Sequence, residues 1–172
     1  LRVSYVGELG WELHFPIEQM PQLYDAIVEA GEPHGLVHFG SYAMNVMRIE
    51  KGYKAWGSEL TTEITPIEAR IERFVDFVGD FIGKEATVAR RDQTDPLSMV
   101  LGYCEVSDGD SDILGNEPAY GTDGEVMGIA TSGAFGHSVG KSLGFVYVAP
   151  DYEAPGSTFE LDMLGTRRTA TV

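Results

Sequence analysis

Basic residues, cysteine and long apolar runs are all scarce in this sequence. It has 12 lysines and arginines against 27 aspartates and glutamates, which gives a formal net charge of −15 at pH 7. Nucleic acids and anionic membranes attract clusters of Lys and Arg, so we expect neither as a partner. The single Cys104 excludes an internal disulfide and fits a reducing compartment, from which we expect a cytoplasmic protein. No apolar run approaches the roughly 20 residues of a membrane-spanning helix.

The residues that are present suit a folded chain. Of the 172 residues, 43% are hydrophobic, which is enough for the core of one ordinary domain or of two small ones. The first residues, Leu1-Arg2-Val3-Ser4-Tyr5-Val6, alternate in a β-type pattern and include no initiator methionine. We therefore expect the chain to be a piece of a longer protein, with functional residues upstream of it.

Residues 1–75 indicate a mixture of a hairpin and helices. Two glycines in the stretch 7–10 can form a turn, so we expect strands around Tyr5 and over residues 11–15. Apolar spacing predicts a helix from Pro21 to the glycine at 31. A second helix is expected over residues 42–51, with Ser41 as its N-cap, and a third beginning at the capping-box sequence 65–68.

The sequence changes character near residues 76–82, where we place a domain boundary. One short helix ends near Arg91, and β-rich segments with glycine punctuation follow. The expected strands are residues 97–106, 125–131, 143–148, 158–161 and 168–172. Five short strands suggest a small barrel or sandwich. The predicted fold class is α+β: an α+β part over residues 1–78 followed by a small all-β barrel over residues 79–172.

Three segments resemble known binding motifs but lack residues that those motifs require. In residues 136–142, only three residues separate the first glycine from the Gly-Lys-Ser sequence, whereas a phosphate-binding loop has four. A β-like segment follows, instead of the helix that such a loop needs. In the acidic stretch 108–112, Ile113 and Ala119 replace the glycine and the bidentate carboxylate of a calcium loop, so we expect a solvated acidic turn between strands there. The four histidines lack zinc-ligand spacing with Cys104 or with one another. We therefore assign neither a metal site nor a catalytic residue.

Tyr5 and Glu12 flank the predicted glycine turn on its two strands. A carboxylate beside aromatic rings suits a flat heteroaromatic ligand, because it accepts two N–H bonds while the rings stack. The alternative is an edge-strand tyrosine and a solvated surface glutamate. The residues alone leave both interpretations open.

Several segments, in order along the whole chain, resemble the aminomethyltransferase (glycine cleavage T-protein) family, and especially the folate-binding C-terminal region of dimethylglycine and sarcosine dehydrogenases. The segments are Ser4-Tyr5-Val6-Gly7-Glu8-Leu9-Gly10-Trp11-Glu12-Leu13, Met47-Arg48-Ile49-Glu50-Lys51-Gly52-Tyr53-Lys54-Ala55-Trp56-Gly57, Leu60-Thr61-Thr62-Glu63-Ile64-Thr65-Pro66-Ile67-Glu68-Ala69, Phe81-Ile82-Gly83-Lys84-Glu85-Ala86, residues 131–142 and Pro155-Gly156-Ser157. The resemblance implies the C-terminal half of a folate-binding domain followed by that family's barrel, with residues 133–140 as a barrel turn.

The resemblance also implies a ligand site. Glu12 would hold the pterin of tetrahydrofolate and Tyr5 would line the same pocket, with Trp56 packing nearby. Arg168, in the pair Arg167-Arg168, is a candidate for the folate glutamate tail, with solvation at a strand edge as the alternative. Since the chain is acidic, attraction of folate must be local, from groups such as Lys54.

Two further residues bear on the resemblance. Arg48 is expected to be structural, with Glu50 as a possible partner. Met44 replaces a basic residue common in glycine-cleavage members. This replacement argues against a plain glycine-cleavage protein.

The implied activity is folate-dependent one-carbon transfer from a small methylated amine. The family's catalytic Asp lies upstream of the Tyr5 segment, so we expect a missing N-terminal segment or partner subunit and an inactive fragment. FAD is implied only if a dehydrogenase domain lies upstream. Two alternatives remain: a folate-dependent demethylase of a sulfonium substrate, and a non-catalytic folate-binding or scaffold module.

Overall fold

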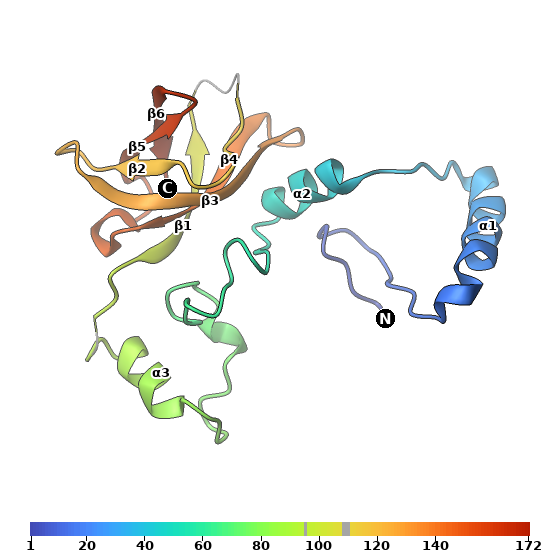
Figure 1. Ribbon diagram of the computed structural model, residues 1–172, viewed down its shortest axis with the longest axis horizontal. Helices are drawn as coiled ribbons and strands as arrows, with labels where there is room; N and C mark the ends of the chain where they lie inside the picture. The colour runs from blue at the N-terminus through green and yellow to red at the C-terminus, as the bar shows by residue number, and fades with distance from the viewer. Residues whose placement is uncertain (95, 108–110) are drawn as a thin grey trace.

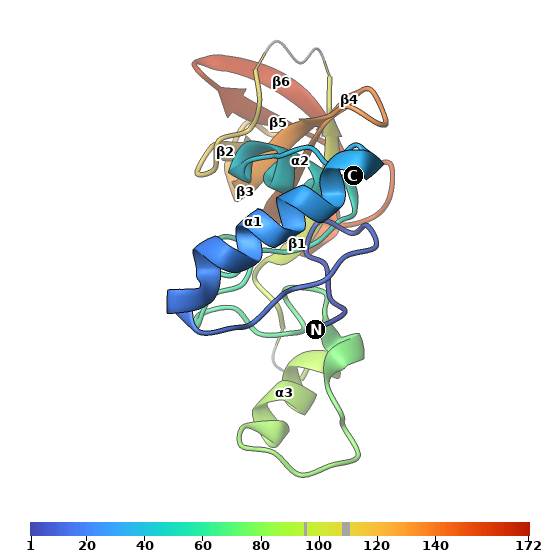
Figure 2. The same cartoon turned by 90° about the vertical axis from the view of Figure 1, so that its right-hand side faces the viewer.

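The computed structural model describes residues 1–94, 96–107 and 111–172. A β-barrel forms its C-terminal part, and the N-terminal residues extend away from it (Figure 1). Helix α2 (Ser41–Glu50) contacts the barrel, whereas α1 (Met20–Gly31) lies at the far end of the molecule in Figure 1. Helix α3 (Lys84–Arg91) lies below the barrel in Figure 1, and the turned view in Figure 2 also shows it below the barrel. The described part of the chain includes no helix with the length and hydropathy needed to span a bilayer.

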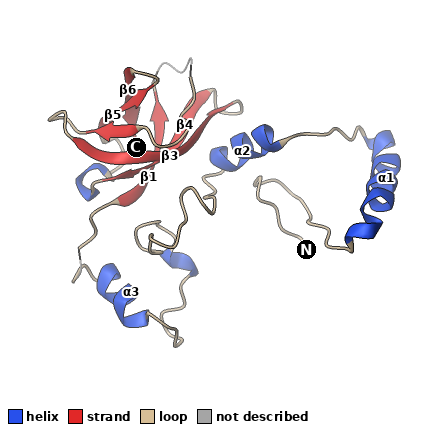
Figure 3. Cartoon of the chain, in the orientation of Figure 1, coloured by secondary structure: helices blue, strands red, loops and turns tan. Residues whose placement is uncertain are grey.

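The barrel consists of antiparallel strands in the order β1-β4-β3-β2-β5-β6, and it is closed (Figure 3). Its strands are β1 (Val100–Val106), β2 (Pro118–Tyr120), β3 (Val126–Gly136), β4 (Lys141–Val148), β5 (Thr158–Met163) and β6 (Thr166–Thr171). The pairing of β3 with β4 shifts by one residue between Ala130 and Ser132. Such a bulge bends a strand and helps a short sheet to close.

Alternating apolar residues fill the barrel interior. They are Val100, Cys104, Val106, Ile113, Ala119, Ala130, Val146, Val148, Phe159, Leu161, Met163 and Ala170. Ile113 fits because two glycines face it: a Cβ on Gly144 would lie 2.2 Å from its Cδ1, and one on Gly133 would lie 2.6 Å from its Cβ. The two glycines therefore make room for one large side chain.

A second apolar cluster joins α2 to the outside of the barrel. Its buried members are Ile49, Leu101, Ala134, Leu143, Phe145 and Tyr147. The Tyr103 hydroxyl donates to the Ile49 carbonyl over 2.8 Å, and the Glu50 carboxylate accepts from the Ser138 N–H over 2.7 Å. These contacts fix the C-terminal end of α2 against β1 and the β3–β4 turn.

The structure confirms the α+β class with a small barrel, but two predicted N-terminal elements differ. The first twelve residues fold back, with Leu1 and Glu12 exchanging backbone hydrogen bonds of 2.8 and 2.9 Å, yet no described strand forms in them. The capping box also forms, since the Glu68 carboxylate accepts from the Thr65 N–H over 2.8 Å. It encloses one turn rather than a helix, because Arg70 adopts a left-handed φ of 54° that ends the turn.

In the barrel, the five predicted strands are confirmed and β2 was missed. The predicted barrel turn over residues 133–140 is wrong in its first half, because β3 continues to residue 136. Helix α2 includes Ser41, predicted as its N-cap, and Gly40 takes the cap position. Residues 108–110 lie outside the described residues, so the predicted acidic turn there stays a prediction.

Candidate functional site

A cavity of about 430 Å³ lies where the N-terminal loop meets the segment that follows α2. Its lining residues come from three stretches of chain: Ser4, Tyr5, Gly52, Tyr53, Lys54, Leu60, Ile71, Arg73 and Phe74. Aromatic rings and two cationic side chains dominate this lining. We call it the Tyr5–Lys54 cavity.

One wall is formed by the way α2 ends. Gly52 has a φ of 68°, and the N–H groups of Gly52 and Tyr53 donate to the carbonyls of Ile49 and Arg48, each over 2.8 Å. This is the glycine-terminated end typical of α-helices. It turns the chain sharply, so that Tyr53 and Lys54 follow at the cavity.

The opposite wall is the loop that carries Tyr5. Gly7, with a φ of 77°, sits directly on Lys51, since a Cβ there would lie 2.1 Å from the Lys51 Cγ. The Lys51 Nζ also lies 3.3 Å from a Glu8 carboxylate oxygen. Because only glycine allows so close an approach, the loop is seated on the end of α2 and Tyr5 is placed in the cavity.

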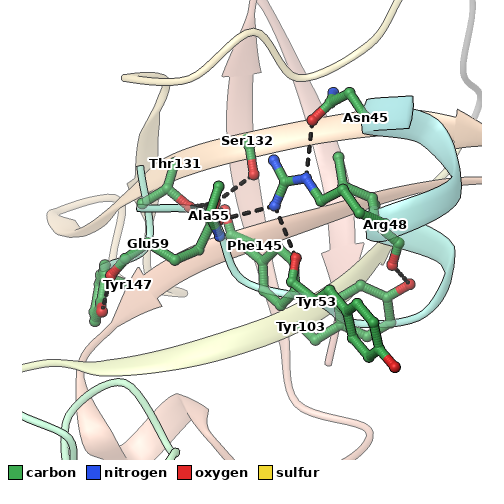
Figure 4. A network of polar contacts seen from close by, with 11 residues as sticks. Asn45, Arg48, Tyr53, Ala55, Glu59, Tyr103, Thr131, Ser132, Phe145 and Tyr147 are labelled. Atoms are coloured by element: carbon green, nitrogen blue, oxygen red, sulfur yellow. Dashed lines mark hydrogen bonds and ion pairs between the residues drawn. The ribbon is translucent and has the colours of Figure 1, made fainter. Parts of the chain in front are cut away.

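Beside the cavity is a buried ionic network (Figure 4). Arg48 is 2% exposed and Glu59 is fully buried, with 2.9 Å between Nη1 and Oε2. Arg48 also donates to the Asn45 side chain over 2.9 Å and to the Tyr53 carbonyl over 3.0 Å. Arg48 thus pairs with a carboxylate, that of Glu59, whereas the Glu50 carboxylate that the sequence offered as a partner accepts hydrogen bonds from Ser138.

The Glu59 carboxylate accepts further hydrogen bonds besides the one from Arg48. It accepts from the Ala55 N–H over 2.7 Å, from the Thr131 hydroxyl over 2.7 Å and from the Ser132 hydroxyl. The network therefore ties α2, the cavity segment and β3 together. A buried ion pair is tolerated when its remaining polar atoms are satisfied in this way.

The cavity is positively charged. Burial lowers the pKa of Lys54, and the neighbouring Arg73 lowers it further, while Glu59 and Glu72 act in the opposite direction. Burial raises the pKa of Tyr5, Arg48 opposes this and Glu59 adds to it, so Tyr5 keeps its phenolic proton at neutral pH. Since the lining includes no Asp or Glu, the arrangement suits an aromatic ligand that carries negative charge.

The structure separates the four predicted site residues. Tyr5 lines the cavity, but Glu12 lies beside a different hollow and its carboxylate is 3.4 Å from the His14 ring nitrogen. Trp56 is 75% exposed and lines none of the described cavities. Arg168 lies on β6, opposite Leu161 in the barrel.

Most of the cavity was not predicted from the sequence. Lys54 was proposed only as a local source of attraction, and Arg73 and Phe74 were not proposed. These two follow the helix start predicted at residues 65–68, and no pattern indicated that they face Tyr5. The glycine that ends α2 was the available signal, because it turns the next residues toward the N-terminal loop.

Two family models match the chain in sequence. The GCVT N-terminal domain matches residues 1–79, and the glycine cleavage T-protein C-terminal barrel domain matches residues 101–172. The crystal structure of the glycine cleavage system aminomethyltransferase T from Bartonella henselae has the same fold, with a TM-score of 0.87 over 99% of this chain and 47% of that chain, at 22% identity.

Curated relatives agree with the family models. Mitochondrial dimethylglycine dehydrogenase of Mus musculus is 40% identical over the whole chain, which covers 20% of that protein. Aminomethyltransferase of Natranaerobius thermophilus is 33% identical over 93% of the chain and 43% of that protein. The 4-methylaminobutanoate oxidase (formaldehyde-forming) of Paenarthrobacter nicotinovorans is 34% identical over the whole chain and 21% of that protein. The chain thus spans about a fifth of the dimethylglycine dehydrogenases that it matches.

The barrel and the α+β segment before it define a chain of the aminomethyltransferase class. The chain belongs to the glycine cleavage T-protein family, with dimethylglycine dehydrogenase-like relatives.

Proposed function

We propose that this chain takes part in tetrahydrofolate-dependent one-carbon transfer within a dimethylglycine or sarcosine dehydrogenase-like enzyme. The Tyr5–Lys54 cavity is the observation that carries the proposal, because its aromatic and cationic lining falls within the residues matched by the family model. The names of the relatives support a one-carbon reaction on a methylated amine.

The chemistry of the lining fits tetrahydrofolate in two respects. The ligand has flat ring systems, which the side chains of Tyr5, Tyr53 and Phe74 can pack against. It also has a glutamate tail, for which the Arg73 guanidinium offers a carboxylate-binding fork. When bound, tetrahydrofolate supplies the amine nitrogens that accept the one-carbon unit.

The proposal keeps Glu12 as the acceptor for the amino edge of the pterin. Its support is the resemblance of residues 4–13 alone, because Glu12 lies outside the lining of the Tyr5–Lys54 cavity, beside the hollow that Leu13 and His14 also line. Trp56 and Arg168 stay predictions, since the cavity lining includes neither of them.

For the wider protein, we propose a small methylated amine as the one-carbon donor. FAD belongs to the proposal only where a dehydrogenase domain is part of the same protein, and the upstream catalytic Asp would come from the rest of the folate-binding domain. We keep the domain division at 1–78 and 79–172, supported by the two separate family matches. Cytoplasmic location stays a prediction, because several relatives are named as mitochondrial.

Calorimetric titration with tetrahydrofolate tests the proposal in the native protein that contains the chain. Glu12→Ala is expected to weaken binding about tenfold, or about 1.4 kcal/mol, because a charged hydrogen-bond acceptor is lost. Glu18→Ala, an exposed glutamate outside the described cavities, is the matched control. Equal affinity of Glu12→Ala and the wild type would remove Glu12 from the site.

Product analysis with dimethylglycine, sarcosine and a sulfonium substrate separates the enzymatic alternatives. The proposal predicts one-carbon transfer from the amines. Transfer from the sulfonium compound alone would support the demethylase, and folate binding without any transfer would support the non-catalytic module.

A further inference from the structure

The bulge in β3 turns two neighbouring hydroxyls to the same side of the barrel wall. Along this strand, Ala130 belongs to the interior cluster, whereas Ala134 belongs to the second cluster, outside the barrel. Side chains of a regular strand alternate, so Ser132 would point inward together with Ala130. The register shift between Ala130 and Ser132 adds one residue, Thr131, to the strand. Thr131 and Ser132 therefore both face outward, because a bulge redirects the side chains that follow it.

Both hydroxyls donate to one oxygen of the Glu59 carboxylate (Figure 4). The Thr131 hydroxyl lies 2.7 Å from Oε1, and the Ser132 hydroxyl donates to the same atom. The barrel also holds the backbone of this residue, since the Tyr147 hydroxyl on β4 donates to the Glu59 carbonyl over 2.7 Å. Glu59 is fully buried, so these barrel hydroxyls fix its position relative to β3 and β4.

The other oxygen of Glu59 faces the cavity segment. Oε2 accepts from the Ala55 N–H over 2.7 Å and from the Arg48 Nη1 over 2.9 Å. The same Nη1 donates to the Tyr53 carbonyl over 3.0 Å, and Tyr53 and Lys54 line the cavity. One carboxylate therefore connects the barrel with a wall of the cavity: Oε1 binds to the barrel and Oε2 binds to the groups that hold the wall.

We propose that Thr131 and Ser132 are positioning residues for the ligand of the cavity, acting through the buried ion pair. The proposal rests on the proposed function for the identity of that ligand, tetrahydrofolate. Within the described part of the chain, the two hydroxyls are the donors that Oε1 of Glu59 has. A buried carboxylate oxygen without a donor is costly, so loss of both hydroxyls would turn the carboxylate toward other donors. Arg48 would then no longer hold the Tyr53 carbonyl in place, and this wall of the cavity would become more mobile.

Hydrogen exchange followed by mass spectrometry measures the positioning without any ligand. Thr131→Val and Ser132→Ala together remove the two hydroxyls from the native protein that contains the chain. Ser142→Ala is the matched control, because Ser142 is a buried serine of β4 whose hydroxyl has no hydrogen-bond partner among the described residues. In the double variant alone, the amides of residues 53–55 should exchange at least about threefold faster, and those of β6, three strands away from β3, should change less. No acceleration at residues 53–55, or an equal one in β6, would overturn the proposal.

Calorimetry with tetrahydrofolate connects this positioning to binding. The double variant is expected to bind about tenfold more weakly than the wild type, and Ser142→Ala should match the wild type. Thr131→Ser keeps the hydroxyl and loses a methyl group, so it should bind more tightly than Thr131→Val, which keeps the volume. Wild-type affinity in the double variant, or weaker binding by Thr131→Ser than by Thr131→Val, would overturn the proposal. A wild-type protein that does not bind tetrahydrofolate would contradict the proposed function alone, because the exchange measurement decides the positioning without folate.

Discussion

Glu59 is the residue on which most of the polar contacts around the cavity converge. Its carboxylate receives hydrogen bonds from α2, from the cavity segment and from β3. A buried charge of this kind contributes little net stability over an apolar replacement, but removing one partner leaves the other unpaired in a medium of low dielectric constant. The position of the cavity segment therefore depends on both members of the Arg48–Glu59 pair.

We predict that Glu59→Ala lowers the free energy of unfolding by about 3–5 kcal/mol, because it leaves the buried Arg48 guanidinium without its carboxylate partner. Urea denaturation followed by circular dichroism measures the loss. Glu160→Ala is the control, since its pair with Arg167 is about half-exposed and worth no more than about 1 kcal/mol. Similar losses for the two variants would contradict the structural role of the network.

Burial also sets an alkaline limit on stability. It raises the pKa of Cys104 from 9.0 to about 12, and it raises the pKa of Tyr103 to about 12 with a further contribution from Glu50. Both groups keep their protons in the folded chain at a pH where the unfolded chain releases them. Their contribution is therefore complete below about pH 9 and is lost as the pH rises toward 12.

Accordingly, the free energy of unfolding should fall between about pH 9 and pH 12, by at most about 1.4 kcal/mol per pH unit for each group. Urea midpoints across this range give the slope, and Cys104→Ala should flatten it. A slope unchanged in Cys104→Ala would show that the thiol does not contribute.

At the scale of elements, the packing of Ile113 against β3 and β4 closes the barrel wall. Gly144→Ala places a methyl group 2.2 Å from the Ile113 Cδ1 and 3.2 Å from the Ser132 carbonyl oxygen. We predict a loss of about 1–3 kcal/mol from this overpacking. Gly102→Ala on β1 is the control, because its nearest contact would be an ordinary 3.5 Å.

A double-mutant cycle measures this contact directly. Ile113→Val removes the Cδ1 atom, so it should recover part of the stability lost in Gly144→Ala when the two are combined. Purely additive effects of the two substitutions would contradict the contact.

Periodicity predicted the longer elements but not the short ones. Apolar spacing located α1, the end signals at Ser41 and Gly52 located α2, and β-type patterns between glycine-rich turns located five strands. Strand β2 has three residues and begins with a proline, so it offers no alternation to detect. The capping box at Thr65 was correctly identified as a local contact, but the left-handed Arg70 that ends its turn had no signal in the sequence.

The site was predictable only in part, for a related reason. Tyr5 and Glu12 belong to one short sequence pattern, whereas the cavity joins three stretches whose approach depends on Gly7 meeting Lys51 and on the buried Arg48–Glu59 pair. Such contacts between distant residues are set by packing. Lys54 and Arg73 consequently emerge as cavity residues only from the three-dimensional structure.

At the scale of the whole molecule, the net charge of the chain and the charge of the cavity lining have opposite signs. The chain carries a net charge of −15, yet the cavity lining contains two cationic side chains and no carboxylate. Screening confines charge effects to about 10 Å at ordinary ionic strength, so an anionic ligand responds mainly to the groups nearest to it. Arg73 is the permanent charge among them, because an arginine does not lose its proton.

The most direct measurement is therefore a calorimetric titration of tetrahydrofolate into the wild-type protein, Arg73→Gln and Arg167→Gln. Arg73 lines the Tyr5–Lys54 cavity, whereas Arg167 is an exposed arginine on the barrel strand β6. The account predicts about a tenfold loss of affinity, or about 1.4 kcal/mol, for Arg73→Gln and none for Arg167→Gln. Wild-type affinity in Arg73→Gln, or an equal loss in both variants, would contradict the assignment of this cavity as the folate site.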